Sequence, residues 1–308
     1  MRQTALNMVH ELARLDQRVV FIGSDLGAGT LQNFREEFPD RWFMEGVAEQ
    51  NLIGLASGLA LEGFIPYVNT IATFLSRRCF EQIVVDACLH NLPLRLLSSG
   101  GGLVYAPLGP THLAIEDLSI LRAVPNMTVI APSDAHEMRL TMESSLAHAG
   151  PLYIRFGKGG DPVVPIERNG FEIGRAYWVL PPEATNFVST GIMTEACRQV
   201  ALRLAAEGRP CGVLHVPTVK PLDIDALWTL ARSSQTILTV EENVLAGGLG
   251  SAVLEALVDN AMPLTRFKRL GLPDAFSHNY GSQADLLRDA GLTSDQIHET
   301  ALREISQC

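Results

Sequence analysis

The sequence predicts two α/β domains, each with a largely parallel sheet flanked by helices. Its 308 residues, at about 150 residues per domain, are enough for two domains with cores of their own. Hydrophobic residues make up 47% and charged residues 19% of the chain, as is typical of globular proteins. Segments of helical period also alternate with short apolar segments, which is the pattern of parallel sheets.

The first domain is expected over residues 1–160, where helices and strands alternate. Pro93 and the run Gly100 to Gly102 mark the two ends of one strand, and the cap-like pair Ser133-Asp134 begins a later helix. In chain order, we expect helices at 5–15, 49–61, 113–123 and after 134, and strands at 18–22, 94–97, 127–131 and 152–156.

A segment that mixes glycines and prolines then interrupts the alternation. We interpret residues 161–185 as a linker that includes a possible strand at 177–180. The second, smaller domain is expected over 186–308. Its strands are expected at 187–189, 211–216, 237–240 and 267–270, and its helices at 193–207, at 224–231 and from Gly250 to about 257.

Composition excludes several classes of protein. The 24 Lys and Arg against 34 Asp and Glu give a net charge of −10, which repels nucleic acids and acidic membranes. The longest apolar stretch, near Leu52 to Leu61, is too short to span a bilayer. The sequence begins in a helical pattern without signal-peptide features, and its five cysteines include no C-x-x-C pair. We expect a cytoplasmic protein with neither a zinc site nor a disulfide framework.

Several motifs invite a functional interpretation, but none is decisive alone. Gly248 to Gly250 lies between a strand and a helix, as in dinucleotide-binding turns. The third glycine of that motif is missing and Glu241-Glu242 precedes it, so a structural turn is favoured. Glu49, at the start of an apolar helix, could simply complement the helix dipole. His112 could be a structural histidine, and Phe74 would ordinarily lie in a core.

Together, in this order and spacing, the motifs of the first domain resemble the pyrimidine-binding domain of transketolases. They are Gly23-Ser24-Asp25-Leu26, Glu45-Gly46-Val47-Ala48-Glu49-Gln50-Asn51, Ala56-Ser57-Gly58-Leu59-Ala60, Thr73-Phe74, Gly109-Pro110-Thr111-His112 and Ile115-Glu116-Asp117. The second domain resembles the C-terminal domain shared by transketolases, deoxyxylulose-phosphate synthases and the β subunits of 2-oxo acid dehydrogenases. Its motifs are Lys220-Pro221-Leu222-Asp223, Thr239-Val240-Glu241-Glu242 and Gly247-Gly248-Leu249-Gly250.

The resemblance implies roles for individual residues around thiamine diphosphate. Glu49 would share a proton with the cofactor's aminopyrimidine ring, and Phe74 would stack on that ring. Asp25 would lie at the edge of the site that faces another subunit. His112 would exchange protons with substrate oxygens. For the phosphate groups of sugar substrates, the candidates are Arg2, Arg77 and Lys158.

One motif of the family is missing. Its members hold the cofactor's diphosphate through a divalent metal, Mg²⁺ or else Ca²⁺ or Mn²⁺, on a G-D-G motif followed by a distant Asn. This sequence contains no G-D-G. We therefore expect the C-terminal subunit of a split transketolase, whose N-terminal partner subunit brings the metal and the diphosphate site. Self-association to a dimer or a dimer of heterodimers is expected, with a sugar or sugar phosphate as substrate.

Three departures from the family pattern bear on the substrate. Leu108 replaces the usual acid before Gly109, Gly100 to Gly102 stand where relatives carry a histidine or arginine, and Lys158 stands where arginine is common. Lysine supplies a positive charge, but it cannot make the two parallel hydrogen bonds that arginine donates to one phosphate. An unusual or unphosphorylated sugar is therefore possible.

Two alternatives remain open. One is a deoxyxylulose-phosphate-synthase-like or 2-oxo acid decarboxylating enzyme, in which a donor such as pyruvate loses carbon dioxide. The loss of the acid at Leu108 favours it, because a hydroxylated donor would miss a partner. The other is a non-catalytic regulatory subunit. It is disfavoured because Glu49, Phe74 and His112 are all present.

Overall fold

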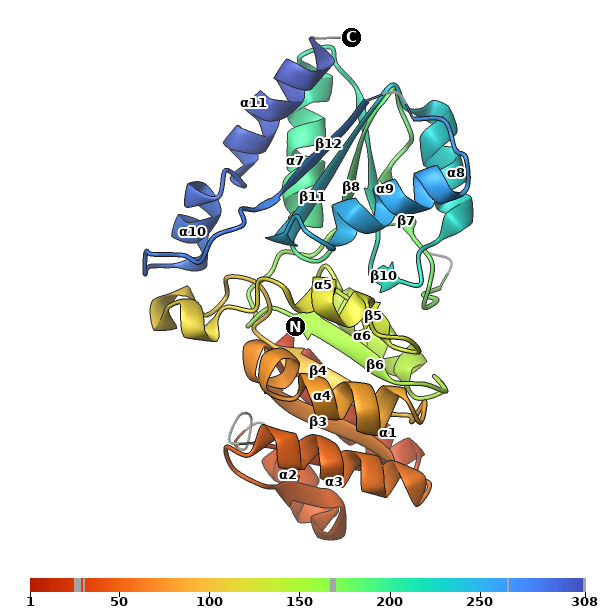
Figure 1. Cartoon of the computed structure of the whole chain (residues 1–308), viewed down its shortest axis with the longest axis vertical. Helices are drawn as coiled ribbons and strands as arrows, with labels where there is room; N and C mark the ends of the chain where they lie inside the picture. Colours follow the sequence, from red (N-terminus) through yellow and green to blue (C-terminus); the bar gives the residue numbers. More distant parts are fainter. Residues whose placement is uncertain (25–28, 30, 167–169, 265, 307–308) are drawn as a thin grey trace.

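Two sheets, one above the other along the long axis of the molecule, organise the chain (Figure 1). The computed structural model describes residues 1–24, 29, 31–166, 170–264 and 266–306. The first sheet has seven strands in the order β10-β5-β6-β4-β3-β1-β2. They are β1 (Val19–Gly23), β2 (Trp42–Met44), β3 (Ile65–Ile71), β4 (Arg95–Ser99), β5 (Thr128–Ile130), β6 (Leu152–Phe156) and β10 (Thr218–Lys220).

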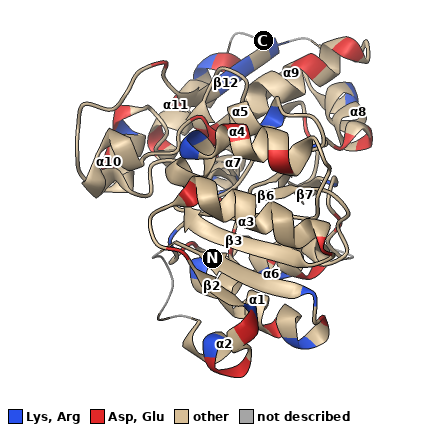
Figure 2. Ribbon diagram, turned by 60° about the horizontal axis from the view of Figure 1, so that its bottom comes forward, with Lys and Arg blue, Asp and Glu red and all other residues tan. Residues whose placement is uncertain are grey.

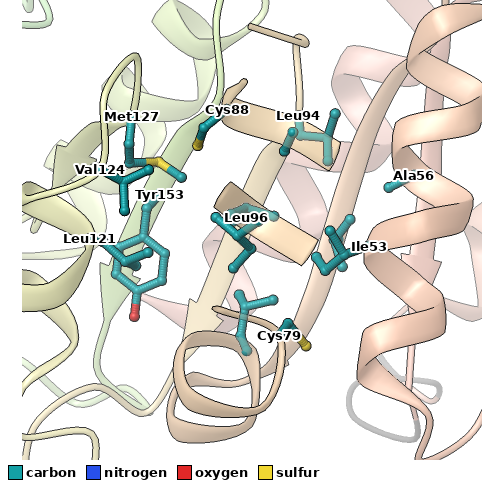
Figure 3. Close-up of a cluster of buried hydrophobic side chains, with 14 of the residues drawn as sticks. Ile53, Ala56, Cys79, Cys88, Leu94, Leu96, Leu121, Val124, Met127 and Tyr153 are labelled. Atoms are coloured by element: carbon teal, nitrogen blue, oxygen red, sulfur yellow. The ribbon is translucent and has the colours of Figure 1, made fainter. Parts of the chain in front are cut away.

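Helices cover both faces of this sheet. They are α1 (Arg2–Leu15), α2 (Gln32–Glu37), α3 (Glu49–Leu61), α4 (Phe80–Gln82), α5 (Asp117–Arg122) and α6 (Ala135–Ser145). Apolar residues of α1 and α6 fill one core with one face of the strands. Residues of α3, α5 and the turns between 74 and 88 fill the other core, part of which Figure 3 shows, with Ile53 and Ala56 of α3 opposite Leu96 of β4.

The second sheet has five strands in the order β12-β11-β8-β9-β7. They are β7 (Tyr177–Leu180), β8 (Thr185–Ser189), β9 (Cys211–His215), β11 (Thr236–Val244) and β12 (Arg266–Leu272). Its helices are α7 (Met193–Ala206), α8 (Ile224–Ser233), α9 (Leu249–Asp259), α10 (Gln283–Asp289) and α11 (Ser294–Ile305). Helices α7, α10 and α11 pack on one face, and α8 and α9 on the other. The chain thus forms two α/β domains with mostly parallel sheets flanked by helices, which confirms the predicted fold class.

Two short strands, β7 and β10, lie at the edges of the two sheets. β7 lies within the segment interpreted as a linker, and it pairs antiparallel with β9 at the edge of the second sheet. β10 comes from the second half of the chain, yet it pairs antiparallel with β5 and extends the first sheet. Backbone hydrogen bonds therefore tie the C-terminal half directly to the N-terminal domain.

Two local expectations for the first domain differ from the structure. The helix expected at 113–123 begins only at Asp117, because Ala114 forms an isolated antiparallel bridge with Gly102. β3 was not among the expected strands, although it lies inside the sheet between β1 and β4. Its Asn69 is fully buried and donates hydrogen bonds to the Leu97 carbonyl oxygen and the Ser99 hydroxyl, at 2.8 and 2.9 Å.

The glycine-rich turn before α9 is a structural cap, as the sequence favoured. The Glu241 carboxylate accepts hydrogen bonds from the backbone N–H groups of Leu249 and Gly250, at 2.7 and 2.8 Å. A Cβ atom at Gly248 would lie 2.1 Å from Glu241 Oε2, so the close approach requires glycine. This carboxylate fills the helix N-terminus that a pyrophosphate would need. In the described part of the chain, every helix is too short or too polar to cross a membrane.

Candidate active site

The predicted site residues gather where the parallel strands of the first sheet end. Parallel strands present their carboxyl ends at one edge of a sheet, where ligands of α/β folds bind. Ser24 directly follows β1, Phe74 lies three residues after β3, Gly100 follows β4 and Lys158 comes two residues after β6. Glu49 begins α3, which follows β2. Asp25 lies outside the described residues.

Glu49 is buried at the start of its helix, with 1% of its surface exposed. Arg78 Nη1 donates to Glu49 Oε2 at 2.5 Å. On the other side, the Thr70 hydroxyl donates to Oε1 at 3.5 Å and accepts from the Ser24 hydroxyl at 3.0 Å. The carboxylate is in the first turn of α3, where it complements the helix dipole. Its two direct partners, Arg78 of η2 (Phe74–Arg78) and Thr70 of β3, hold it at the edge of the sheet.

An aromatic group lies next to this carboxylate. Phe74 opens the π-helical turn η2 (Phe74–Arg78), a type of turn that is frequent at functional sites. The guanidinium carbon of Arg78 lies 4.3 Å from the centre of the Phe74 ring. The His112 ring meets the Phe74 ring edge-on, with centroids 5.1 Å apart, and His112 Nδ1 is 2.9 Å from the Thr111 hydroxyl oxygen. The structure therefore brings Glu49, Phe74 and His112 together.

The three candidate phosphate-binding residues have different surroundings. The Arg77 guanidinium is bidentate to Glu116, with Nη2 donating at 2.7 Å and Nε donating to the other carboxylate oxygen. Arg2 begins α1 and is half-buried, whereas Lys158 is exposed. The Met1 side chain approaches Gly157, and the Met1 amino group lies 3.8 Å from Asp161 Oδ2, so the chain start that carries Arg2 lies beside the turn that carries Lys158.

A buried ionic cluster that no sequence motif indicated lies behind this edge. Arg155 of β6 donates from Nη2 to the Glu242 carbonyl oxygen at 2.6 Å, and its Nε lies 3.4 Å from Asp117 Oδ2. Tyr153 also donates to Asp117 Oδ2, at 2.7 Å. Burial raises the pKa of the Asp117 carboxyl and that of the Glu242 carboxyl. The cluster joins the first domain to the second, because Glu242 belongs to β11.

The run Gly100 to Gly102 makes room for this cluster. A Cβ atom at Gly101 would lie 2.3 Å from Cγ and Nε of Arg155, and one at Gly102 would lie 2.4 Å from Glu242 Oε2. Gly102 also has a φ of +65°, a conformation that favours glycine. In the sequence, the three successive glycines at the end of a strand are therefore the feature that could have indicated a close approach of side chains to the backbone.

Two family models match the chain. The transketolase pyrimidine-binding domain matches residues 1–160, and the transketolase C-terminal domain matches residues 179–297. The chain belongs to the transketolase family.

Individual relatives extend this transketolase-family assignment. A 1-deoxy-D-xylulose-5-phosphate synthase of Geobacter sulfurreducens is 39% identical over 93% of this chain and 45% of its own length, so the chain spans about half of that relative. A 6-deoxy-6-sulfo-D-fructose transketolase subunit of Clostridium sp. strain MSTE9 is 34% identical over 98% of this chain and 93% of its own. The solved structure of a split-gene transketolase, an inactive β4 tetramer, is 33% identical, covers 98% of this chain and 97% of its own, and has a TM-score of 0.89.

The transketolase family implies dependence on thiamine diphosphate, and the residues at the sheet edge fit the pyrimidine end of that cofactor. Glu49 supplies a buried carboxylate whose Oε1 accepts one long hydrogen bond, from Thr70, among the residues that the structure describes. Phe74 supplies an aromatic face at the same place. Within the described ranges, no group of three His, Cys, Asp or Glu side chains could hold a metal ion.

Proposed function

We propose that this chain is the pyrimidine-binding half of a thiamine-diphosphate-dependent transketolase. One observation carries the proposal: the buried Glu49 carboxylate lies close to the Phe74 and His112 rings at the carboxyl edge of the first sheet. An N-terminal partner subunit would supply the diphosphate site and its metal, Mg²⁺ or else Ca²⁺ or Mn²⁺. The nearly full-length match to a transketolase subunit and to a split-gene transketolase supports a cofactor site that is shared between two subunits.

The proposal gives four residues of this chain a defined task. The cofactor, when bound, supplies the carbanion chemistry that makes and breaks carbon–carbon bonds beside a carbonyl. Glu49 holds and returns a proton at the pyrimidine ring nitrogen, and Phe74 covers the face of the ring. His112 gives a proton to a substrate oxygen and takes it back. Asp25 is assigned to the edge of the cofactor site that faces the partner.

The proposed reaction moves a two-carbon ketol unit from a ketose or ketose phosphate to an aldose or aldose phosphate. Lys158 and Arg2 are the proposed phosphate ligands, because they are cationic and belong to neighbouring segments where β6 ends. Arg77 would contribute through Nη1, since Glu116 takes its Nε and Nη2. Leu108, which is 51% exposed beside the His112 turn, offers no carboxylate to a substrate hydroxyl.

A decarboxylating enzyme similar to deoxyxylulose-phosphate synthase is the second candidate. The 39% identity to such a synthase supports it, and so does the apolar Leu108, because a 2-oxo acid donor has fewer hydroxyl groups to bind. The chain, its partner, thiamine diphosphate and Mg²⁺ should be combined with labelled pyruvate or with a ketose donor. Release of labelled carbon dioxide would favour the synthase-like reaction, and ketol transfer without it would favour the transketolase.

Glu49→Gln tests the mechanism common to both reactions. The amide cannot hold and return the proton, so turnover and exchange of the cofactor's thiazolium proton for deuterium should fall by roughly 10² to 10⁴. If Glu49 served only the helix dipole, the variant would lose about 0.3–1 kcal/mol of stability and keep its rate. Glu62→Gln, at the exposed other end of α3, is the matched control. Wild-type exchange in an assembled Glu49→Gln enzyme would refute the assignment.

A further inference from the structure

Arg78 contacts both residues that are proposed to receive the pyrimidine. Its Nη1 donates to Glu49 Oε2 at 2.5 Å, and its guanidinium carbon lies 4.3 Å from the centre of the Phe74 ring. Nothing in the sequence distinguished it from Arg77, the preceding residue. Arg77 turns instead to Glu116. Two adjacent arginines thus have different partners, and only Arg78 reaches the carboxylate proposed for catalysis.

The backbone explains this difference. A π-helix closes its hydrogen bonds from i to i+5, so residues four apart, such as Phe74 and Arg78, project to nearly the same side. Arg77 projects toward the segment before α5, which carries Glu116. The position of the guanidinium over the Phe74 ring therefore follows from the local geometry of the turn η2.

The guanidinium makes the same two contacts that an aminopyrimidine would need. It is planar, donates N–H to a carboxylate and stacks on an aromatic face. With Arg78 in place, 2% of the Glu49 side chain is exposed, which leaves an incoming ring little access to its oxygens. The Arg78 side chain is itself 36% exposed, so it has an open path into water.

We propose that Arg78 is a placeholder that occupies the pyrimidine position in the isolated chain and must leave Glu49 before the cofactor can engage. This inference rests on the proposed function, because it takes Glu49 and Phe74 as the pyrimidine site. The ion pair keeps the buried carboxylate solvated by a protein group while the site is open. It also competes with the ligand, so the chain by itself binds a pyrimidine more weakly than its pocket would otherwise permit.

The test uses the full chain and 4-amino-5-hydroxymethyl-2-methylpyrimidine, which lacks the thiazolium ring and the diphosphate and therefore probes this chain's own residues. Isothermal titration calorimetry measures its Kd for the wild type and for Arg78→Gln, Arg139→Gln and Glu49→Gln. Arg78→Gln should bind at least about tenfold tighter, since it removes a charge-assisted competitor. Arg139→Gln, which removes an arginine of α6 that pairs with Glu11 outside the site, is the control and should bind as the wild type does; Glu49→Gln should bind more weakly.

The outcomes separate the two proposals. Unchanged or weaker binding by Arg78→Gln, together with binding that still depends on Glu49, would show that Arg78 assists the ligand or ignores it, and would overturn the placeholder alone. Binding that is insensitive to Glu49→Gln, or absent in every variant, would overturn the pyrimidine site and the placeholder with it. The melting temperature of each variant without ligand verifies that it is folded.

Discussion

Gly101→Ala should destabilise the chain, because the new methyl group would collide with a buried arginine. Its Cβ would lie 2.3 Å from Cγ and Nε of Arg155, far inside an ordinary contact of about 3.5–4.0 Å. The Arg155 side chain, 7% exposed, would have to shift by more than about 1 Å. That movement would disrupt its 2.6 Å hydrogen bond to the Glu242 carbonyl oxygen. Overpacking costs about 1–3 kcal/mol, and the lost charge-assisted bond costs about 1.5–3 kcal/mol.

Urea denaturation followed by far-ultraviolet circular dichroism measures the effect, which we expect to be about 3 kcal/mol or more. Gly58→Ala is the matched control. Gly58 lies in α3, and a Cβ atom added there would have no atom of another part of the chain within 4 Å, so alanine should stabilise the chain by about 0.8–1 kcal/mol. In an Arg155→Met background, Gly101→Ala should cost much less. Equal losses in both backgrounds, or none in the wild-type background, would refute the steric explanation.

Two further predictions concern buried carboxylates. Burial raises the pKa of Glu241 to about 7, so the folded state binds its proton more tightly than the unfolded state does. Its contribution to stability is complete below about pH 4.5 and is lost as the pH rises through 7, by up to about 1.4 kcal/mol per pH unit. Urea unfolding between pH 5 and 8 should show this slope in the wild type and not in Glu241→Gln; parallel curves would contradict it. His215→Ala removes the imidazole 2.7 Å from Glu137, in a fully buried pair between the domains, and leaves a buried acceptor without that partner. It should cost about 1–3 kcal/mol. A thermal melt would detect this loss, and an unchanged melting temperature would exclude it.

Much of the architecture could be predicted from local pattern. Alternating helical and strand-like segments indicated the two α/β domains, and Asp134 caps α6 as expected, accepting from the Glu137 backbone at 2.8 Å. β3 escaped prediction because Pro66 and Asn69 interrupt its apolar sequence. Asn69 is tolerated there for a tertiary reason, because its amide nitrogen donates to the Leu97 carbonyl oxygen and the Ser99 hydroxyl of the neighbouring strand β4.

Part of the candidate site could likewise be predicted from the sequence, and part could not. Glu49, Phe74 and His112 were proposed from motifs, and the structure brings them together. The surface of α3 beyond Glu49 carries no charge, as its sequence indicates and Figure 2 shows. The ion pair between Glu49 and Arg78 could not be predicted, because the two residues are 29 positions apart. Their meeting depends on how α3 and η2 pack on the sheet.

By itself, the sequence determined the fold class and the family motifs, because both depend on short-range pattern. Only the tertiary structure decided which charges meet. In the tertiary structure, Arg78 pairs with Glu49 and Arg77 pairs with Glu116. Arg155 passes close to Gly101 and donates a hydrogen bond to the second domain. Such pairs join residues distant in the chain, and their energies depend on burial and on distances of a few ångströms. Neither quantity is encoded in spacing along the sequence.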